Sequence, residues 1–269
     1  MTAIEEVREA EAPPAIAALY RDLRAVSGVP NVNLIWRHLA SRPGLLDWAW
    51  RTVRPQVANG MAGFAAEGLR TRFAPIRHEE AVFAAPEGAC RLIEIYNLGN
   101  SLNLITLTCL RQALDATLPD ETLRAELREE TAVESVPAIP RRDDLSGDVL
   151  ARVDRLAAHH GVAMRAGVTP SLYLHLARWP ALLPAVEDIV GPLLASGEHE
   201  RVAAEVRAAA ARDAANLLPV LRDPGGGPDA SARQDLRRLL DLFTGTVIPE
   251  MIPVGLVLAA HLQAEGPSA

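Results

Sequence analysis

Two asparagines stand inside the most apolar stretch of the first half of the chain. Residues 88–114 are apolar on nearly every side, which is typical of a central buried helix, and Asn97 and Asn100 lie in the middle. A buried side-chain amide must find hydrogen-bond partners. The pair therefore indicates either a structural network or a site that orients a substrate. The run Asn97-Leu98-Gly99-Asn100 also predicts a break in this helix.

A lone carboxylate, Glu250, lies in the apolar run IPEMIPVGLVL near the end of the sequence. If Glu250 is buried without an arginine partner, its pKa is expected to rise toward the range that suits a general base. The flanking prolines also fit a second interpretation, in which Glu250 marks a helix end that faces solvent.

The histidines suggest structure rather than chemistry. His38 and His175 occupy equivalent positions in the repeat described below and share a helix face with apolar residues. We expect both to be core histidines that bond backbone carbonyls. His159 and His160 close a predicted helix, and we expect them at the surface, where the helix dipole favours a C-terminal histidine.

Motifs for metal or nucleotide binding are missing from the sequence, which contains no HExxH, CxxC, GxGxxG or GxxxxGK. We therefore expect no metal site and no cofactor. Cys90 and Cys109 are far apart in apolar or helical contexts, and this favours two buried thiols in a reducing cytoplasm.

The composition excludes several classes of protein. The net charge is -7 and every basic residue is arginine, without a dense basic cluster, so a nucleic-acid partner is not expected. Residues 246–262 are the only stretch apolar enough to consider for a membrane, but they contain Glu250 and two prolines and are too short. We predict a soluble protein with no membrane partner.

The chain contains an internal repeat. Residues 38–60 and 175–197 lie 137 positions apart, and ten of the 23 paired residues are identical without a gap. Self-similarity at a fixed offset indicates a duplicated structural unit. We expect a first helical repeat over residues 1–136, a linker at 137–148 and a second repeat over 149–269, with a pocket at the seam between them.

Helical periodicity accounts for almost all of the sequence. The predicted helices cover residues 13–27, 31–41, 44–53, 60–72, 78–84, 88–114, 149–159, 171–178, 181–195, 198–218 and 234–262. The last of these is expected to be interrupted at Gly245 and Pro249. Since no sustained alternation of apolar and polar residues is present, no sheet is assigned. The prediction is an all-α fold of two pseudo-symmetric helical repeats.

Three runs carry a family resemblance. VPNVNLIWRHLASRPGLLDWAWR at 29–51, IYNLGNSLNLITLTCL at 95–110 and GVTPSLYLHLARWP at 167–180 resemble the group I 2-haloacid dehalogenases, in order and spacing over nearly the whole chain. The resemblance implies an all-α fold of two repeats with the active site between them. It also implies displacement of halide from the α-carbon of a carboxylic acid by direct attack of water, without a metal or a covalent intermediate.

The sequence departs from this family where the chemistry takes place. The resemblance implies an Asp as general base within a Ser-Asp-Phe/Tyr run, but the aligned residues are Ser171, Leu172 and Tyr173, so Leu172 takes the place of the base. A general base is worth about two to four orders of magnitude in rate. The asparagine that helps to hold the water corresponds to Asn100. The aromatic residues of the first-repeat pocket correspond to Asn31 and Leu34.

These residues predict an enzyme that displaces a leaving group at a saturated carbon without a water-activating Asp. A nucleophile carried by the substrate itself meets this requirement through ring closure. Two alternatives stay open, namely a non-catalytic small-molecule binder or subunit of a hetero-complex, and a hydrolytic dehalogenase with another base. The partner is a small molecule, with a carboxylic acid as one option, and both a homo-oligomer and a hetero-subunit are compatible with the sequence. The candidate catalytic residues are Asn100 and Glu250, and the candidate substrate-binding residues are Asn31, Leu34, Asn97, Ser171, Leu172 and Tyr173.

Overall fold

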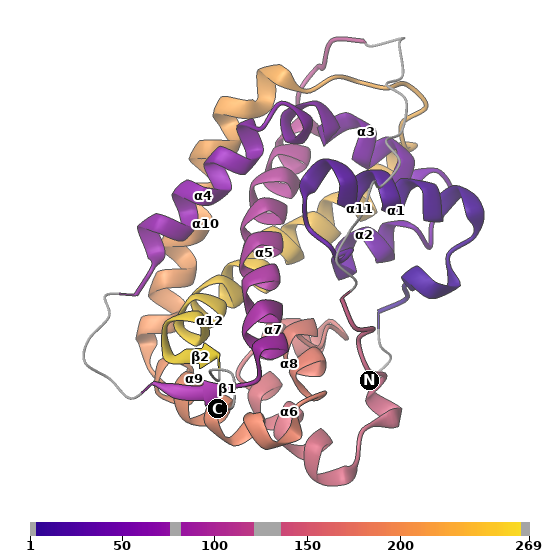
Figure 1. Ribbon diagram of the computed structural model, residues 1–269. Helices are drawn as coiled ribbons and strands as arrows, with labels where there is room; N and C mark the ends of the chain where they lie inside the picture. Colours follow the sequence, from indigo (N-terminus) through magenta and orange to yellow (C-terminus); the bar gives the residue numbers. More distant parts are fainter. Residues whose placement is uncertain (1–3, 76–81, 121–135, 265–269) are drawn as a thin grey trace.

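The structure, a computed structural model, describes residues 4–75, 82–120 and 136–264. Helices make up almost all of it, which confirms the all-α prediction (Figure 1). The elements before the linker are η1 (Glu9–Glu11), α1 (Pro14–Ser27), α2 (Leu34–Leu39), α3 (Leu45–Ala58), α4 (Met61–Phe73), β1 (Phe83–Ala85) and α5 (Glu87–Ala113). The elements after it are η2 (Arg142–Asp144), α6 (Gly147–Ala158), α7 (Gly161–Arg165), α8 (Ser171–Leu176), η3 (Pro180–Leu182), α9 (Leu183–Ala195), α10 (Gly197–Leu217), η4 (Leu218–Val220), α11 (Ala230–Leu242), η5 (Phe243–Val247), α12 (Ile248–His261) and β2 (Leu262–Ala264).

Helix α5 occupies the centre of the molecule and packs against α4, α10 and α12 (Figure 1). The predicted break at residues 97–100 is wrong, because α5 runs unbroken from Glu87 to Ala113. Two of its buried amides bond backbone carbonyls without interrupting the helix. Asn97 Nδ2 donates to the carbonyl of Gly255 on α12 at 2.9 Å, and Asn103 Nδ2 donates to the carbonyl of Gly99 at 2.7 Å.

The close approach of α12 to α5 depends on Gly255. A Cβ atom at this position would lie 2.0 Å from Asn97 Oδ1, so a larger residue would displace the Asn97 side chain that bonds α12. The buried Asn97 amide and Gly255 therefore fix the spacing between the two long helices of the core.

The C-terminal helices α11 and α12 are joined by the π-helical turn η5. The interruption expected at Gly245 and Pro249 takes this form, and the helical path continues through Pro249, which lies in the first turn of α12. By length and composition, the segment Ala230–His261 is long and apolar enough to cross a membrane. However, 61% of its most apolar window is buried inside the protein, and a buried core helix passes the same test.

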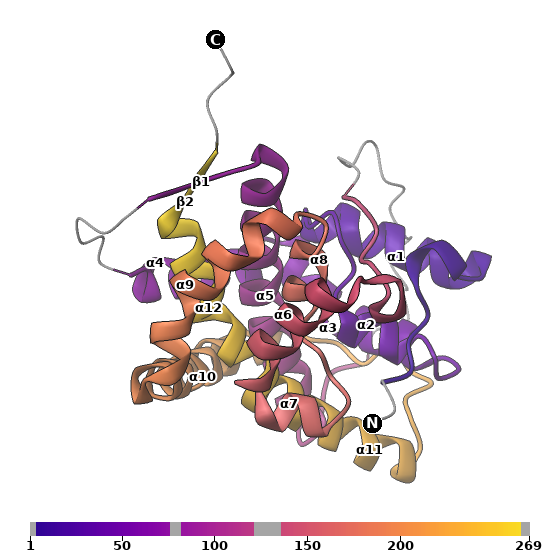
Figure 2. The same ribbon diagram turned by 90° about the horizontal axis from the view of Figure 1, so that it is seen from below.

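Two short strands close one end of the molecule (Figure 2). β1 pairs in parallel with β2, with Phe83 opposite Leu262. The prediction of a helix over residues 78–84 is therefore wrong for Phe83 and Ala84, which are extended because they pair with the end of the chain. Residues 78–81 of that prediction lie outside the described residues.

Helix bounds recur at the offset found in the sequence. α2 and α8 begin at Leu34 and Ser171 and end at Leu39 and Leu176, each pair 137 positions apart. The buried hydrophobic residues, however, do not divide at the linker. The N-terminal half of α5 packs with α6, α8, α9 and α12, whereas α10 and α11 share a core with the first-half helices. The duplication and the boundary at 137–148 stay predictions.

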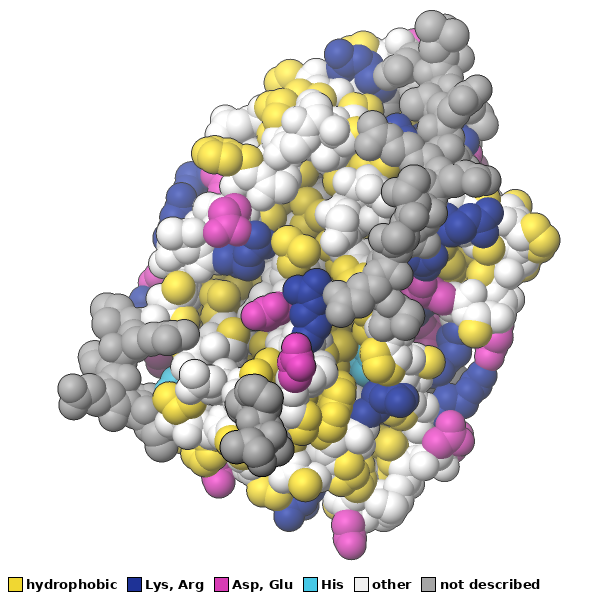
Figure 3. Space-filling view, in the orientation of Figure 1, with side chains coloured by type: hydrophobic (Ala, Val, Ile, Leu, Met, Phe, Trp, Pro, Cys, Tyr) yellow, Lys and Arg dark blue, Asp and Glu magenta, His cyan; other side chains and the backbone are white. Residues whose placement is uncertain are grey.

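Charged side chains of both signs are mixed over the face shown in Figure 3. Arginine side chains are spread over this face and do not gather into one patch. This distribution agrees with the composition, which gave no reason to expect a polyanionic partner.

Candidate functional site

A small cavity lies where both halves of the chain meet, and we call it the cleft pocket. Its volume is about 50 Å³. Its lining comes from the start of α2, the middle of α5, the start of α8, the π-turn η5 and α12. The lining residues are Asn33, Leu34, Ile35, Tyr96, Asn100, Val168, Thr169, Pro170, Ser171, Leu172, Phe243, Val247, Ile248 and Met251.

Asn100 is the central polar residue of the cleft pocket. It is 8% exposed, and its Oδ1 accepts a hydrogen bond of 3.4 Å from Asn33 Nδ2. Among the described residues, no acceptor bonds its Nδ2 atom, so this donor remains for a group in the pocket. The structure thus brings together four of the candidate residues, namely Leu34, Asn100, Ser171 and Leu172.

Leu172 is 1% exposed and packs into the core that α8 shares with α5, α9 and α12, while it also lines the cleft pocket. The described lining contains no carboxylate and no imidazole. Tyr96 is its only titratable side chain, and burial raises the pKa of this phenol well above its usual range. The pocket is therefore uncharged and mainly apolar at neutral pH.

The π-turn η5 contributes two apolar side chains to the lining of the cleft pocket, the aromatic Phe243 and the aliphatic Val247. A π-turn inserts an extra residue into a helix and is common at functional sites. Sequence reasoning predicted an interruption here but did not connect it with the pocket. The signal available in the sequence was Gly245, a weak helix former between two β-branched threonines.

Four candidate residues lie outside the cleft pocket. Asn97 bonds α12, as described above, and Asn31 lines a separate and larger hollow. Tyr173 and Glu250 each neighbour a lining residue in sequence, yet both belong to a polar network behind the wall. Their proposed roles in substrate binding and catalysis stay predictions.

That network joins α8, α10 and α12 to the turn that follows α6. His160 Nδ1 lies 2.9 Å from Glu250 Oε2, and His160 Nε2 lies 3.0 Å from the hydroxyl of Tyr173. His199 Nε2 bonds the main-chain oxygen of Glu250 at 2.9 Å. Burial, followed by the nearby Glu250 carboxylate, raises the pKa of Tyr173, so its O–H donates to His160 and the imidazole donates to Glu250.

The network corrects the solvent-facing interpretation of two residues. His160 is not at the surface but 1% exposed, because the chain turns after α6 and directs this side chain between α8 and α12. Glu250 does not stand alone at a solvent-facing helix end, since its carboxylate meets His160 and its side chain is only 21% exposed. Sequence reasoning treated the two residues separately because they lie 90 positions apart in the chain.

The equivalent histidines behave as predicted. His38 Nδ1 and His175 Nε2 each lie 2.6 Å from a main-chain oxygen, of Glu5 and Pro137 respectively. Burial lowers the pKa of His175 to about 4, so this imidazole is neutral at physiological pH. His38 therefore ties the N-terminal segment to α2, and His175 ties the start of the predicted linker to α8. The cysteines are free thiols, with Cys109 buried and Cys90 half-buried.

Metal ligands do not gather in the part of the chain that the structure describes. Residues 4–75, 82–120 and 136–264 contain no group of three or more His, Cys, Asp or Glu side chains placed to hold an ion. The candidate chemistry of the described site therefore depends on amides, hydroxyls and an apolar wall.

No protein-family model matches the chain. A configuration-inverting 2-haloacid dehalogenase of Alcaligenes xylosoxydans xylosoxydans is 28% identical over 210 residues, which are 70% of this chain and 68% of the relative. The chain is homologous to 2-haloacid dehalogenases. This confirms the resemblance seen in the sequence and supports a dehalogenase-type enzyme.

Solved structures of D-2-haloacid dehalogenases share the fold of this dehalogenase homologue. A mutant enzyme matches 96% of the chain and 95% of its own length with a TM-score of 0.74 at 17% identity. A complex with L-LA covers 95% of both chains with a TM-score of 0.74 at 19% identity. A mutant complex with D-2-CPA covers 97% of this chain and 94% of its own, with a TM-score of 0.71 at 20% identity.

Proposed function

We propose that this chain displaces a leaving group from a saturated carbon of a small molecule in the cleft pocket, and that the substrate supplies the nucleophile. The observation that carries the proposal is the lining of the pocket, which offers amides, hydroxyls and apolar side chains but no carboxylate or imidazole among the described residues. Water in such a pocket has no group to take its proton. The relative named as a 2-haloacid dehalogenase supports halide as the leaving group and a small acid as the substrate.

A carboxylate on the substrate satisfies this requirement because it is already ionised at neutral pH. One carboxylate oxygen attacks the carbon that carries the halogen, the carbon–oxygen bond forms, and the carbon–halogen bond breaks as halide leaves with the electron pair. The product is a lactone, the negative charge passes to the halide, and no proton moves. The protein contributes by holding the chain of the substrate in an attack-ready shape.

Two residues support stabilisation of the leaving halide. Asn100 Nδ2 has no acceptor among the described residues, and Ser171, which carries a hydroxyl, lines the same pocket. Donors that meet developing negative charge in a dry site lower the barrier. Leu172 keeps the site dry, since its side chain occupies the position at which the resemblance implies a water-activating Asp.

The size of the cleft pocket restricts the substrate. A cavity of about 50 Å³ is far smaller than the ~300–1,000 Å³ of pockets for drug-sized ligands. This favours a compact halocarboxylate of a few non-hydrogen atoms over a larger molecule.

The test measures halide release from 4-chlorobutanoate and from both enantiomers of 2-chloropropionate. We expect chloride and lactone above background from 4-chlorobutanoate and no release from 2-chloropropionate. In water enriched in heavy oxygen, the lactone should carry no label. Asn100→Ala should lower kcat by about 10-fold to 1,000-fold, whereas the exposed Asn216→Ala should not change it.

Turnover of 2-chloropropionate with labelled oxygen in the product would contradict the proposal and favour a hydrolytic mechanism. Glu250 is then the first base to examine, through Glu250→Gln. Under the proposed mechanism this variant loses stability and keeps kcat, because Glu250 does not line the cleft pocket.

A further inference from the structure

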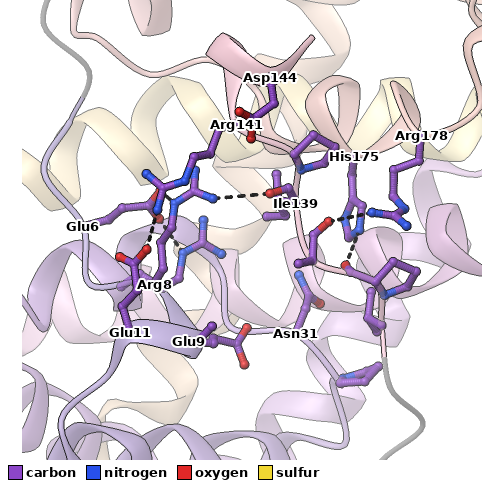
Figure 4. A pocket seen from close by; sticks show the side chains of 17 residues that line it. Glu6, Arg8, Glu9, Glu11, Asn31, Ile139, Arg141, Asp144, His175 and Arg178 are labelled. Carbon is purple, nitrogen blue, oxygen red and sulfur yellow. Dashed lines mark hydrogen bonds and ion pairs between the residues drawn. The ribbon is translucent and has the colours of Figure 1, made fainter.

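Two asparagines that precede helix α2 lie in different hollows. Asn31 lines the larger hollow, of about 610 Å³, which is drawn in Figure 4. Asn33, two positions later, lines the cleft pocket. Asn33 is also the residue directly before α2, where asparagine is one of the preferred caps of a helix N-terminus.

The side chain of Asn33 does not cap α2. An asparagine in this position commonly accepts a hydrogen bond from a free N–H group of the first turn, but within α2, all of which the structure describes, no N–H bonds this side chain. Instead, Asn33 Nδ2 donates to Asn100 Oδ1 on α5 at 3.4 Å. Asn33 therefore bonds a side chain of the cleft pocket rather than its own helix.

The chain before α2 lies close against α5. A Cβ atom on Gly99 would lie 3.3 Å from Val29 Cγ1 and 3.9 Å from Asn33 Oδ1. Three residues further along both segments, Trp36 Nε1 donates to Asn103 Oδ1 at 2.6 Å. Each of the two bonds joins residues 67 positions apart, so together they fix the register of α2 on α5.

The bond from Asn33 determines which end of the Asn100 amide faces the pocket. A side-chain amide has an acceptor oxygen and a donor NH₂ group. Because Asn33 donates to the oxygen, the NH₂ group of Asn100 is left for the pocket. The reversed amide would set two NH₂ groups against each other and would present an oxygen, which repels a halide, to the pocket.

We propose that Asn33 is a positioning residue that keeps the donor end of the Asn100 amide turned toward the leaving halide. This inference rests on the proposed displacement in the same pocket. Asn33 acts through Asn100 and takes no part in making or breaking bonds. Its loss should therefore lower kcat without destabilising the protein, provided that the new residue can cap α2.

The test replaces Asn33 with serine. A serine hydroxyl is too short to hold the Asn100 amide but is a preferred N-cap. We expect Asn33→Ser to lower kcat for 4-chlorobutanoate at least about fivefold, with the urea midpoint unchanged or higher. In an Asn100→Ala background the same change should not lower kcat further. The matched control Asn216→Ser, on the exposed side of α10, should leave kcat unchanged.

Three results in this assay would overturn the proposal. The first is an unchanged kcat in Asn33→Ser. The second is an equal loss of kcat with and without Asn100, which would show that Asn33 does not act through it. The third is a loss of kcat accompanied by a lower urea midpoint, which would assign Asn33 a structural role.

Chloride binding tests the same role without turnover. Chloride that exchanges rapidly with a protein site broadens its NMR signal, and Asn100→Ala reports the broadening that other sites cause. Asn33→Ser should remove most of the broadening that depends on Asn100. If this result is obtained while 4-chlorobutanoate is not turned over, the proposed reaction fails and the positioning role stands. Full Asn100-dependent broadening in Asn33→Ser, or none in the unaltered protein, would refute the positioning role.

Discussion

His160 and Glu250 lie 90 positions apart in the sequence, and their side chains meet at 2.9 Å. His160 also meets the hydroxyl of Tyr173 at 3.0 Å, so one imidazole connects α8 to α12. Both helices carry residues of the cleft pocket directly beside the network, namely Leu172 and Met251. The network therefore supports the wall of the pocket from behind.

Removal of one hydroxyl tests this support. Tyr173→Phe leaves His160 Nε2 buried without a donor, which should lower the free energy of unfolding by about 1–3 kcal/mol. Urea denaturation measures the change. His159→Gln alters the neighbouring exposed histidine and should change stability by less than about 0.5 kcal/mol. A Tyr173→Phe protein as stable as the original would show that the network does not contribute to folding.

Leu172→Asp should introduce hydrolytic turnover. The substitution places a carboxylate in the lining of the cleft pocket, where it can accept a proton from water. We expect chloride release from 2-chloropropionate, which the original protein should not give, together with lower stability from burial of the acid. The assay is chloride release at equal concentrations of folded protein.

Leu176→Asp is the matched control for this gain of activity. Leu176 is equally buried on the same helix but does not line the cleft pocket. It should lose stability without gaining turnover. If neither variant releases chloride while Leu172→Asp remains folded, the position of Leu172 is not sufficient for base catalysis in this pocket.

Asp22 should be among the most sensitive polar residues of the first half. It is fully buried, and it accepts hydrogen bonds from Trp50 Nε1 at 2.7 Å and from Arg54 at 2.8 and 2.9 Å. Asp22→Asn leaves a buried guanidinium without its counter-charge, so we expect a loss of about 3–5 kcal/mol in chemical denaturation. Asp47→Asn breaks the partly exposed pair with Arg51 and should cost less than about 1 kcal/mol.

His175 should make the protein acid-sensitive. Burial lowers its pKa to about 4 in the folded state, from 6.5 for the unperturbed side chain. Between these values the unfolded chain binds more protons than the folded one, so stability is fully present above pH 6.5 and decreases as pH falls toward 4. The contribution of His175 to this loss is about 3 kcal/mol.

Denaturation curves recorded across this pH range measure the effect. His175→Gln should remove most of this part of the pH dependence, whereas His159→Gln should retain it because His159 is exposed. An unchanged pH profile in His175→Gln would assign the acid sensitivity to other groups.

Much of the architecture was determined by the sequence alone. Hydrophobic periodicity predicted a central helix over residues 88–114, and α5 covers Glu87–Ala113. The place of His38 and His175 on apolar helix faces predicted that both side chains bond backbone carbonyls, and both do. These features depend on local helix geometry and on which face of a helix is apolar, and both are encoded within a few turns of the chain.

Only the tertiary structure decided which polar residues share a site. Asn97 and Asn100 are three positions apart, yet Asn97 bonds α12 while Asn100 meets Asn33 before α2. The contact between His160 and Glu250 likewise joins segments far apart in sequence. A helix determines the direction in which its side chains point, but the packing of other helices determines what they meet, and that packing depends on the whole core.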